Sequence, residues 1–168
     1  RVRDCGVYCE IVPHTIGIRQ LKAMEPCGLI FTGGPNSVYD EASPHISGDI
    51  FSLNVPILGI CYGCQLLAYM LGGKVSPAEK ASAREYGRTD TSYLPGSALF
   101  DAGSGITWMS HGDYIAVPPQ GFNITATTAA GPVAAMECKE KRLYGVQFHL
   151  EVNHTQGGID MLKRFLFD

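Results

Sequence analysis

The feature that most constrains the fold is the alternation of short apolar runs with helical patterns in the first half of the chain. Residues 28–32 and 56–60 are apolar stretches of strand length, and each leads into glycine-containing sequence. Such runs, when they alternate with helical patterns, are typical of a parallel sheet with helices on both faces. The same reasoning predicts a strand over residues 7–12 and helices over 16–24, 47–53 and 62–71.

The second half of the chain has a different pattern. Strand patterns joined by turns rich in Gly, Pro, Asn and Asp occupy residues 106–110, 122–128, 133–138 and 143–148. A helix is predicted over 159–167, where apolar residues recur at helical spacing. We therefore expect a mixed or antiparallel extension of the sheet, followed by a closing helix.

The N-terminus and the overall pattern together give the predicted fold class. Residues 1–5 look like the end of a helix, whereas a doubly wound domain normally opens with a strand. No linker or repeat divides the chain, so we predict one domain over 1–168. The predicted fold is α/β: a doubly wound, mostly parallel sheet with helices on both faces and a small antiparallel extension, its first strand missing from this sequence.

Charge and cysteine content exclude several classes of protein. Lys and Arg number 13 and Asp and Glu number 16, which gives a net charge of −3 without a basic patch, so we expect no nucleic-acid partner. No apolar run has the length of a membrane span and the first residues do not form a signal-peptide pattern, so we expect no membrane association. The six cysteines are scattered rather than arranged as a secreted disulfide framework, which predicts a cytoplasmic protein with reduced thiols.

The strongest chemical signal is the sequence Gly-Ile-Cys-Tyr-Gly-Cys-Gln over residues 59–65. It places Cys61 at the turn between a predicted strand and a predicted helix, with Gly59 and Gly63 leaving room on either side. A nucleophile on such a turn is exposed above the sheet edge, and a helix N-terminus favours the reactive thiolate. Cys61 is therefore a candidate nucleophile, although a free cysteine is more often simply buried.

Cys61 and Cys64 also form a Cys-x-x-Cys pair, which leaves two other interpretations open. Such a pair at the start of a helix is typical of thiol redox proteins, and it could also form half of a zinc site. Zinc is the weaker alternative because the sequence has no second Cys-x-x-Cys, and we predict no metal. The redox interpretation leaves a downstream histidine and glutamate without a role.

These two residues, His149 and Glu151, follow the last predicted strand. Residues two apart in an extended chain point to the same side, so the carboxylate can orient the imidazole ring. A nucleophilic cysteine needs a base, and the base needs such an orienting group. His149 and Glu151 are therefore the candidate base and its partner, with a solvated strand end as the simpler interpretation.

Two loops complete the candidate site. The sequence Thr-Gly-Gly-Pro-Asn over 32–36 follows a predicted strand, where backbone N–H groups can face a developing oxyanion. No Gly-Lys-Ser/Thr follows it, so it is not a phosphate loop. The sequence Ser-His-Gly-Asp over 110–113 follows another predicted strand and by itself indicates only a polar turn.

In combination these motifs resemble one enzyme family. The stretches 32–35, 59–65 and 148–151 stand in the order found in class I glutamine amidotransferases. Within that family the sequence is most similar to the glutaminase domains of GMP synthetases. The stretches that indicate this branch are 33–39, 84–88, 108–113 and 154–158.

The resemblance implies a role for each residue of the candidate site. Cys61 would attack the side-chain amide of glutamine, and His149, oriented by Glu151, would act as base and then as acid for the leaving ammonia. The backbone N–H groups of Gly34 and Tyr62 would hold the oxyanion. The pocket for glutamine would be lined by Gln65, Ser110, His111, Gly112 and Asp113.

The resemblance also implies partners. In the family, ammonia passes to an ATP-pyrophosphatase part that uses ATP and Mg²⁺ to convert xanthosine monophosphate to GMP. That part is not in this chain, and we expect no cofactor in the glutaminase domain itself. Contact with it is expected around residues 84–88 and 154–155.

Two positions depart from the family's usual motifs, with Cys64 in place of Met and Leu150 in place of Pro. Loss of the rigid proline could loosen the geometry between the base and its orienting carboxylate. The alternatives to the GMP synthetase branch are another class I glutamine amidotransferase and, in a different functional class, a Cys-x-x-Cys redox or interaction protein.

Overall fold

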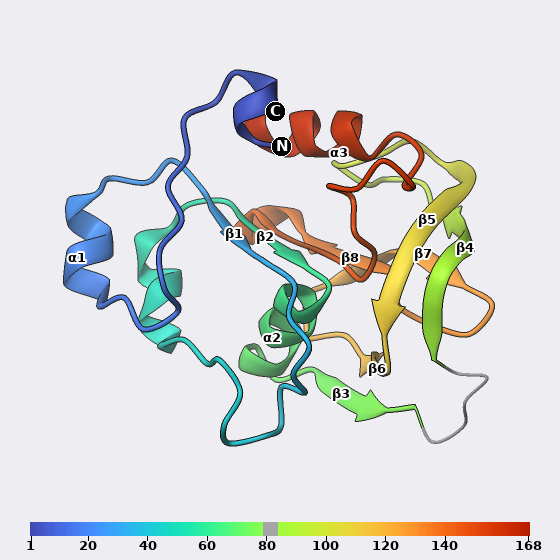
Figure 1. Ribbon diagram of the computed structural model, residues 1–168, viewed down its shortest axis with the longest axis horizontal. Helices are drawn as coiled ribbons and strands as arrows, with labels where there is room; N and C mark the ends of the chain where they lie inside the picture. Colours follow the sequence, from blue (N-terminus) through green and yellow to red (C-terminus); the bar gives the residue numbers. More distant parts are fainter. Residues whose placement is uncertain (79–83) are drawn as a thin grey trace.

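The computed structural model describes residues 1–78 and 84–168 (Figure 1). The helices of these residues, with η marking a 3-10 helix, are η1 (Arg3–Cys5), α1 (Ile18–Ala23), η2 (Gly48–Leu53), α2 (Tyr62–Met70), η4 (Lys139–Lys141) and α3 (Gly158–Phe167). The strands are β1 (Leu29–Phe31), β2 (Ile57–Ile60), β3 (Lys74–Pro77), β4 (Glu85–Tyr93), β5 (Gly103–His111), β6 (Asp113–Val117), β7 (Asn123–Thr128), β8 (Ala135–Cys138) and β9 (Leu143–Val146).

Within the described residues, seven strands form one mixed sheet in the order β1-β2-β9-β8-β7-β4-β5. β1, β2 and β9 pair in parallel, whereas the pairs from β9 through β8, β7 and β4 to β5 are antiparallel. β3 and β6 form a separate two-stranded antiparallel sheet. The predicted α/β class is confirmed, with an antiparallel part that is larger than expected.

Helices cover both faces of the parallel part, with α3 above the strands and α2 below them in Figure 1. On one face, Leu67 of α2 belongs to the same buried cluster as Ile57 of β2. On the other face, Leu162 of α3 clusters with Leu58 of the same strand. Because successive residues of a strand point to opposite faces, Ile57 and Leu58 each support a different helix. The short strand β2 is thereby buried on both sides, as a central parallel strand should be.

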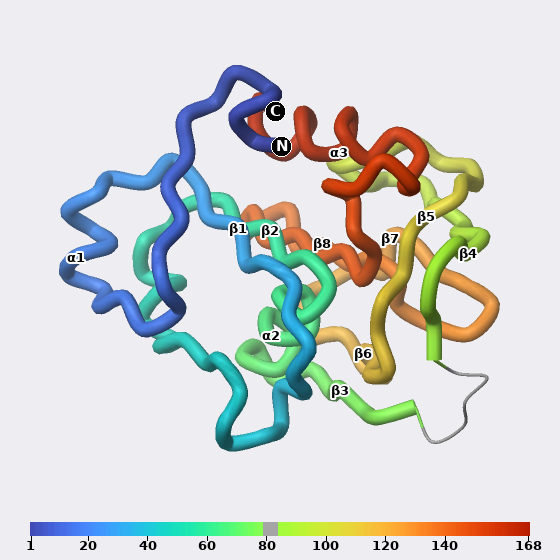
Figure 2. The backbone as a smooth tube through the Cα atoms, in the orientation of Figure 1, coloured from blue at the N-terminus to red at the C-terminus, as the bar shows by residue number. Residues whose placement is uncertain are grey.

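The strand predicted over residues 7–12 is not formed. These residues follow an extended path from η1 toward α1, without a ladder partner among the described residues (Figure 2). Tyr8 is 79% exposed and Ile11 is 98% exposed, so the apolar side chains of this segment are not all buried. Residue composition favours a strand here, but a strand is stable only when a neighbouring strand pairs with it.

β4 is the longest element that the sequence pattern did not indicate. Its buried positions are Glu85 and Thr91, which are polar, so the usual alternation of apolar and polar residues is absent. The strand forms because it pairs with β5 along its whole length, from Glu85 opposite His111 to Tyr93 opposite Gly103. A long-range partner, rather than local sequence, therefore determines this edge of the sheet.

Candidate active site

Cys61 lies at the junction of β2 and α2, directly before the first residue of the helix. Its φ is 53° and its ψ is −110°, a conformation that a residue with a side chain rarely adopts. The N–H of Cys61 donates to the carbonyl of Val146 at 2.8 Å, and the carbonyl of Cys61 accepts from the N–H of Gln65 at 3.1 Å. These bonds hold a strained turn of the kind that presents a nucleophile between a strand and a helix.

Gly59 and Gly63 flank this turn because there is no space for a side chain at either position. A Cβ atom on Gly63 would lie 2.1 Å from the carbonyl oxygen of Phe31, and one on Gly59 would lie 2.5 Å from the carbonyl oxygen of Gly63. Both obstructing atoms belong to the backbone and cannot rotate away. The first turn of α2 is therefore packed directly onto β1 and β2, which places Cys61 at the carboxyl end of the parallel strands.

His149 follows β9, and its side chain lies beside both Cys61 and Glu151. Its Nδ1 atom lies 2.7 Å from Oε1 of Glu151. The interaction with Cys61 first, and then the hydrogen bond with Glu151, raise the pKa of His149 to about 10, against the opposing effect of burial. The arrangement favours the protonated ring, which is the form that can give a proton to a leaving amine.

The carboxylate of Glu151 is suited to orient this ring. Desolvation raises the pKa of Glu151, but the hydrogen bond from His149 and its positive charge outweigh this and hold the pKa below its usual range. Glu151 therefore stays ionised at neutral pH and keeps the Nδ1 atom of His149 protonated. The other carboxylate oxygen, Oε2, is buried and has no partner among the described residues.

The loop over residues 32–36 reaches both catalytic candidates. A Cβ atom on Gly33 would lie 3.0 Å from Cε1 of His149 and 3.5 Å from Cβ of Cys61, so only a glycine leaves the ring undisturbed. The sequence reasoning did not single out Gly33. Gly33, Cys61 and His149 thus belong to three segments that are far apart in the sequence and meet at one point.

The two predicted oxyanion donors, Gly34 and Tyr62, are neighbours. A Cβ atom on Gly34 would lie 3.7 Å from the ring of Tyr62, so the loop backbone passes close to the start of α2. Within the described residues, the N–H of Gly34 donates to no backbone carbonyl. The N–H of Tyr62 belongs to the first turn of α2, where no intrahelical acceptor exists. Both donors are therefore available to a developing oxyanion.

The turn between β5 and β6 approaches the nucleophile through its backbone. The carbonyl of Ser110 accepts a hydrogen bond from the thiol of Cys61 at 3.7 Å. The carbonyl of Asp113 accepts one from Nε2 of Gln65 at 2.9 Å. Ser110 thus contacts Cys61, the residue before α2, and Asp113 contacts Gln65 of α2. Both were predicted to line the pocket.

The same turn is fixed to the 32–36 loop and its continuation. The carboxylate of Asp113 accepts hydrogen bonds from the hydroxyl groups of Ser37 and Tyr39. The carbonyl of Gly112 accepts from the N–H of Ala78, after β3, at 2.9 Å. The structure therefore brings Gly112 and Asp113 close to the 32–36 loop and to α2, and their role in binding glutamine stays a prediction.

The ring of His111 is turned away from this rim. It is buried at 5% exposure, and its Nε2 atom lies 3.4 Å from Oε2 of Glu85, which is also buried. Alternation along β5 explains the difference, because His111 points to the opposite face from Ser110. The position of the side chain does not support the predicted role of His111 in lining the glutamine pocket; it pairs with β4 instead.

Cys64 is also turned away from Cys61. It is fully buried in an apolar cluster with Ala68, Val133 and Met136, where desolvation raises the pKa of its thiol. Its Sγ atom lies where a side chain on Gly145 would be, 2.6 Å from that Cβ position. All six cysteines are free. Cys64 therefore occupies the place of an apolar packing residue, and its geometry gives the redox interpretation no support.

Thr155 supports His149, the candidate base, and the sequence reasoning missed this role. The hydroxyl of Thr155 donates to the carbonyl of His149 at 2.6 Å and accepts from the N–H of Trp108 at 3.0 Å. The N–H of His149 donates to the carbonyl of Trp108 at 2.9 Å. The outer side of this arrangement is formed by His154, whose ring stacks on Trp108 with centroids 4.5 Å apart. No local pattern marks Thr155, because one of its two partners, Trp108, lies on β5.

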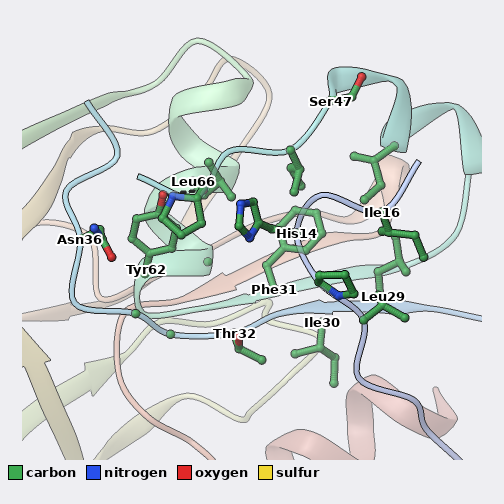
Figure 3. A pocket seen from close by; sticks show the side chains of 18 of the residues that line it. His14, Ile16, Leu29, Ile30, Phe31, Thr32, Asn36, Ser47, Tyr62 and Leu66 are labelled. Atoms are coloured by element: carbon green, nitrogen blue, oxygen red, sulfur yellow. Dashed lines mark hydrogen bonds between the residues drawn. The ribbon is translucent and has the colours of Figure 1, made fainter. Parts of the chain in front are cut away.

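A cavity of about 420 Å³ adjoins the candidate site and shares Gly34 and Tyr62 with it (Figure 3). It lies between the segment that carries His14 and Ile16, the strand β1, and the side of α2 that carries Leu66. The 32–36 loop contributes to its wall, whereas Cys61 and His149 do not line it. The candidate site is thus recognised by its chemistry and not by the size of a cavity.

Among residues 1–78 and 84–168, no three side chains of His, Cys, Asp or Glu are grouped so that they could hold a metal ion. In the same part of the chain, every helix is too short or too polar to span a membrane.

The family model of class-I glutamine amidotransferases matches the whole chain, residues 1–168. The chain belongs to the class-I glutamine amidotransferase family. It is 56% identical over 173 residues to a GMP synthase (glutamine-hydrolysing) of Clostridium perfringens, a comparison that covers 100% of this chain and 33% of that protein. It is 54% identical over 168 residues to the enzyme of the same name from Lachnospira eligens, with coverage of 99% and 32%. The chain therefore spans about a third of the length of these relatives.

Two solved structures have a similar fold. A candidate GMP synthase subunit from Thermoplasma acidophilum is 31% identical with a TM-score of 0.85, over 98% of this chain and 82% of that one. A glutamine amidotransferase of Thermotoga maritima is 23% identical with a TM-score of 0.66, over 85% and 62% of the two chains. The second likeness concerns the fold alone.

The departure from the family motif at Leu150 does not loosen the site of this amidotransferase. Leu150 is fully buried and packs in the same core cluster as Phe148 and Leu162. Close backbone packing at Gly158, where a Cβ atom would lie 2.1 Å from the carbonyl oxygen of Leu150, further restricts this segment. Core packing thus holds the residue between His149 and Glu151 in place of a proline ring.

Proposed function

We propose that this chain is the glutaminase part of a glutamine-hydrolysing GMP synthase. The observation that carries the proposal is the position of His149, which lies beside Cys61 and is hydrogen-bonded to Glu151. The identity of 52–56% to GMP synthases over the whole chain supports the branch. We place the protein in the cytoplasm, where the thiol of Cys61 stays reduced.

The proposed reaction begins when the thiolate of Cys61 attacks the side-chain amide carbon of glutamine. Negative charge develops on the amide oxygen and is met by the N–H groups of Gly34 and Tyr62. His149 then gives its proton to the departing nitrogen, so that ammonia leaves and a thioester remains on Cys61. The histidine, now neutral, takes a proton from water, which attacks the thioester and releases glutamate. Glutamine and water are consumed, and glutamate and ammonia are formed.

Ammonia produced in this way would be used by an ATP-dependent synthetase part that converts xanthosine monophosphate to GMP. ATP and Mg²⁺ belong to that part in the proposal. The described residues of this chain bring no three metal-binding side chains together, and the sequence lacks a Gly-Lys-Ser/Thr phosphate loop. The curated relatives are about three times as long as this chain, which supports a second catalytic part in those proteins.

The surface proposed for contact with the synthetase part lies on the outer side of β4 and β5. Tyr86 is 65% exposed, and Arg88 and His154 are also exposed. Thr155 was expected to belong to this surface, but it is buried and bonds to His149 instead. A partner that contacts His154 would therefore touch the residue next to Thr155, whose hydroxyl bonds to the carbonyl of His149. We expect the chain alone to be a weak glutaminase and to be activated by the nucleotide-loaded partner.

The first test is ammonia release from glutamine by the wild type, Cys61→Ala and Cys64→Ala. Cys61→Ala should lose activity by several orders of magnitude and still bind glutamine, because it lacks only the nucleophile. Cys64→Ala is the matched control, since Cys64 packs in an apolar cluster away from the reacting groups. Wild-type ammonia release by Cys61→Ala would contradict the proposal.

The second test separates the GMP synthase branch from other amidotransferases. With the full-length protein, GMP should form from xanthosine monophosphate, ATP and either glutamine or an ammonium salt. Cys61→Ala should lose only the glutamine-dependent reaction, because the ammonium salt replaces the missing ammonia. Release of ammonia from glutamine without any amination of xanthosine monophosphate would favour another class I amidotransferase.

A further inference from the structure

Gln147 is a fully buried polar residue for which the mechanism above has no use. It directly follows β9 and is 1% exposed, and its N–H donates to the carbonyl of Ala134 at 2.8 Å. Gln147 lies two residues after Gly145, which faces Cys64 of α2, so its side chain points to the same face of the sheet. There its Oε1 atom lies 3.2 Å from Nε2 of Gln65.

The orientation of the Gln65 amide is determined by its neighbours. Nε2 of Gln65 lies 2.9 Å from the backbone carbonyl of Asp113, and a carbonyl can only accept a hydrogen bond. The nitrogen must therefore face Asp113, and its second hydrogen is taken by Oε1 of Gln147. Both N–H groups of Gln65 are used in this way, which leaves Oε1 as the free polar atom of its amide.

This arrangement leaves a buried donor of Gln147 unpaired. Nε2 of Gln147 is buried and has no hydrogen-bond partner among the described residues. Leaving a buried donor unpaired normally costs about 1–3 kcal/mol. Rotating the amide of Gln147 by half a turn would not remove that cost, because it would place two N–H groups against each other at Gln65. A glutamine that served packing alone would be better replaced by an apolar side chain.

We propose that Gln147 is a positioning residue for substrate binding, which fixes the Gln65 amide so that its oxygen is presented to the substrate. This rests on the proposed function, in which Gln65 borders the glutamine pocket. Glutamine offers N–H donors on its α-ammonium group and on its amide, and a carbonyl oxygen attracts them. A rotated Gln65 would present its own N–H groups and repel them. Gln147 therefore acts on affinity for glutamine and not on the chemical step.

The test uses a diazo-ketone analogue of glutamine that alkylates the nucleophilic thiol, and it measures the inhibition constant and the maximal rate of inactivation separately. In the full-length protein, Gln147→Met keeps the length of the side chain and removes the acceptor. It should raise the inhibition constant about threefold to tenfold, the loss expected for one hydrogen bond, and leave the maximal rate within twofold. Gln147→Glu keeps an acceptor oxygen facing Gln65 and should restore an inhibition constant near that of the wild type.

A double-mutant cycle shows whether Gln147 acts through Gln65. Gln65→Met alone should weaken binding, and adding Gln147→Met to it should change the inhibition constant by less than twofold. Additive effects in the cycle, or a Gln147→Met variant with lowered thermal stability and an unchanged inhibition constant, would overturn the proposal. If Gln147→Met does not fold, Gln147→Asn withdraws the acceptor from Gln65 and makes the same comparison. A wild type that shows no saturable inactivation would instead overturn the proposed function on which this inference rests.

Discussion

The two segments that build the catalytic site are held in different ways. The turn over 59–65 is fixed by close backbone packing, since Gly59 and Gly63 leave no space for a side chain. In the segment over 149–156, core packing holds the buried Leu150, whereas His149 itself is held by hydrogen bonds with Glu151 and Thr155. Cys61 is therefore positioned mainly by close packing, whereas the ring of His149 is positioned mainly by directional hydrogen bonds.

Close backbone packing and hydrogen bonding should respond differently to the substitution of a residue. A close backbone contact fails completely when a single carbon is added, because neither side can rotate away. A network of hydrogen bonds weakens by steps, because each bond contributes about 1 kcal/mol and the others remain. Substitutions in the turn should therefore affect folding, and substitutions in the 149–156 segment should affect mainly the rate.

The largest effect is expected for Gly63→Ala. The added Cβ atom would lie 2.1 Å from the carbonyl oxygen of Phe31, so α2 could not pack against β1. We expect a loss of about 3 kcal/mol or more in the free energy of unfolding, and loss of activity with it. The matched control is Gly48→Ala, where nothing lies within 4 Å of the new atom. Urea unfolding measures both, and equal midpoints for the two variants would break the comparison.

A smaller effect, on rate and not on folding, is expected for Glu151→Gln. Without the carboxylate, the protonated ring of His149 loses a stabilising partner, so the rate of ammonia release should fall about hundredfold. The pKa of His149 should fall from about 10 toward the ordinary value of about 6.5. The pKa should fall and not rise, because the ionised carboxylate of Glu151 favours the charged form of the ring. An NMR titration of the His149 ring measures the shift, with the exposed Glu140→Gln as control.

An unchanged ring pKa in Glu151→Gln would show that Cys61 alone sets it. The contact between His149 and Glu151 would then follow only from their positions after β9. The carboxylate would not be what holds the ring of His149.

The smallest effect is expected for Thr155→Val. Valine has nearly the same shape but leaves the carbonyl of His149 and the N–H of Trp108 without the bridging hydroxyl. We expect a loss of about 1–3 kcal/mol in stability and about tenfold in the rate of ammonia release. Thr155→Ser keeps the hydroxyl and should recover most of both. A Thr155→Ser variant as slow as Thr155→Val would indicate that the methyl group, not the bridge, matters.

The parts of the site that could be predicted from sequence are those whose residues lie close together along the chain. The turn around Cys61 is local, so its strand, glycines and helix all appear within residues 56–71. The pairing of His149 with Glu151 is also local, because residues two apart share a side in an extended chain. Those features were predictable, and the α/β class followed from the same alternation of patterns.

The features that escaped prediction depend on distant partners. The hydroxyl of Thr155 links the carbonyl of His149 to Trp108 on β5, and the contact of His111 with Glu85 needs β4. β4 itself has polar residues at its buried positions, so no periodic pattern marks it. Residues 7–12 show the opposite case, in which a strand-like composition finds no partner among the described residues. Local sequence cannot report which segments the sheet brings together.

The central claim is that Cys61, activated by His149, is the nucleophile that attacks glutamine. The most direct measurement is mass spectrometry of a digest after reaction with the diazo-ketone analogue of glutamine. We expect a single adduct on Cys61, and excess glutamine should suppress it. The adduct should form much more slowly in His149→Gln. Cys64 should stay unmodified, because it is buried in its apolar cluster. An adduct on Cys64, or labelling of Cys61 at the same rate with and without glutamine, would contradict the account.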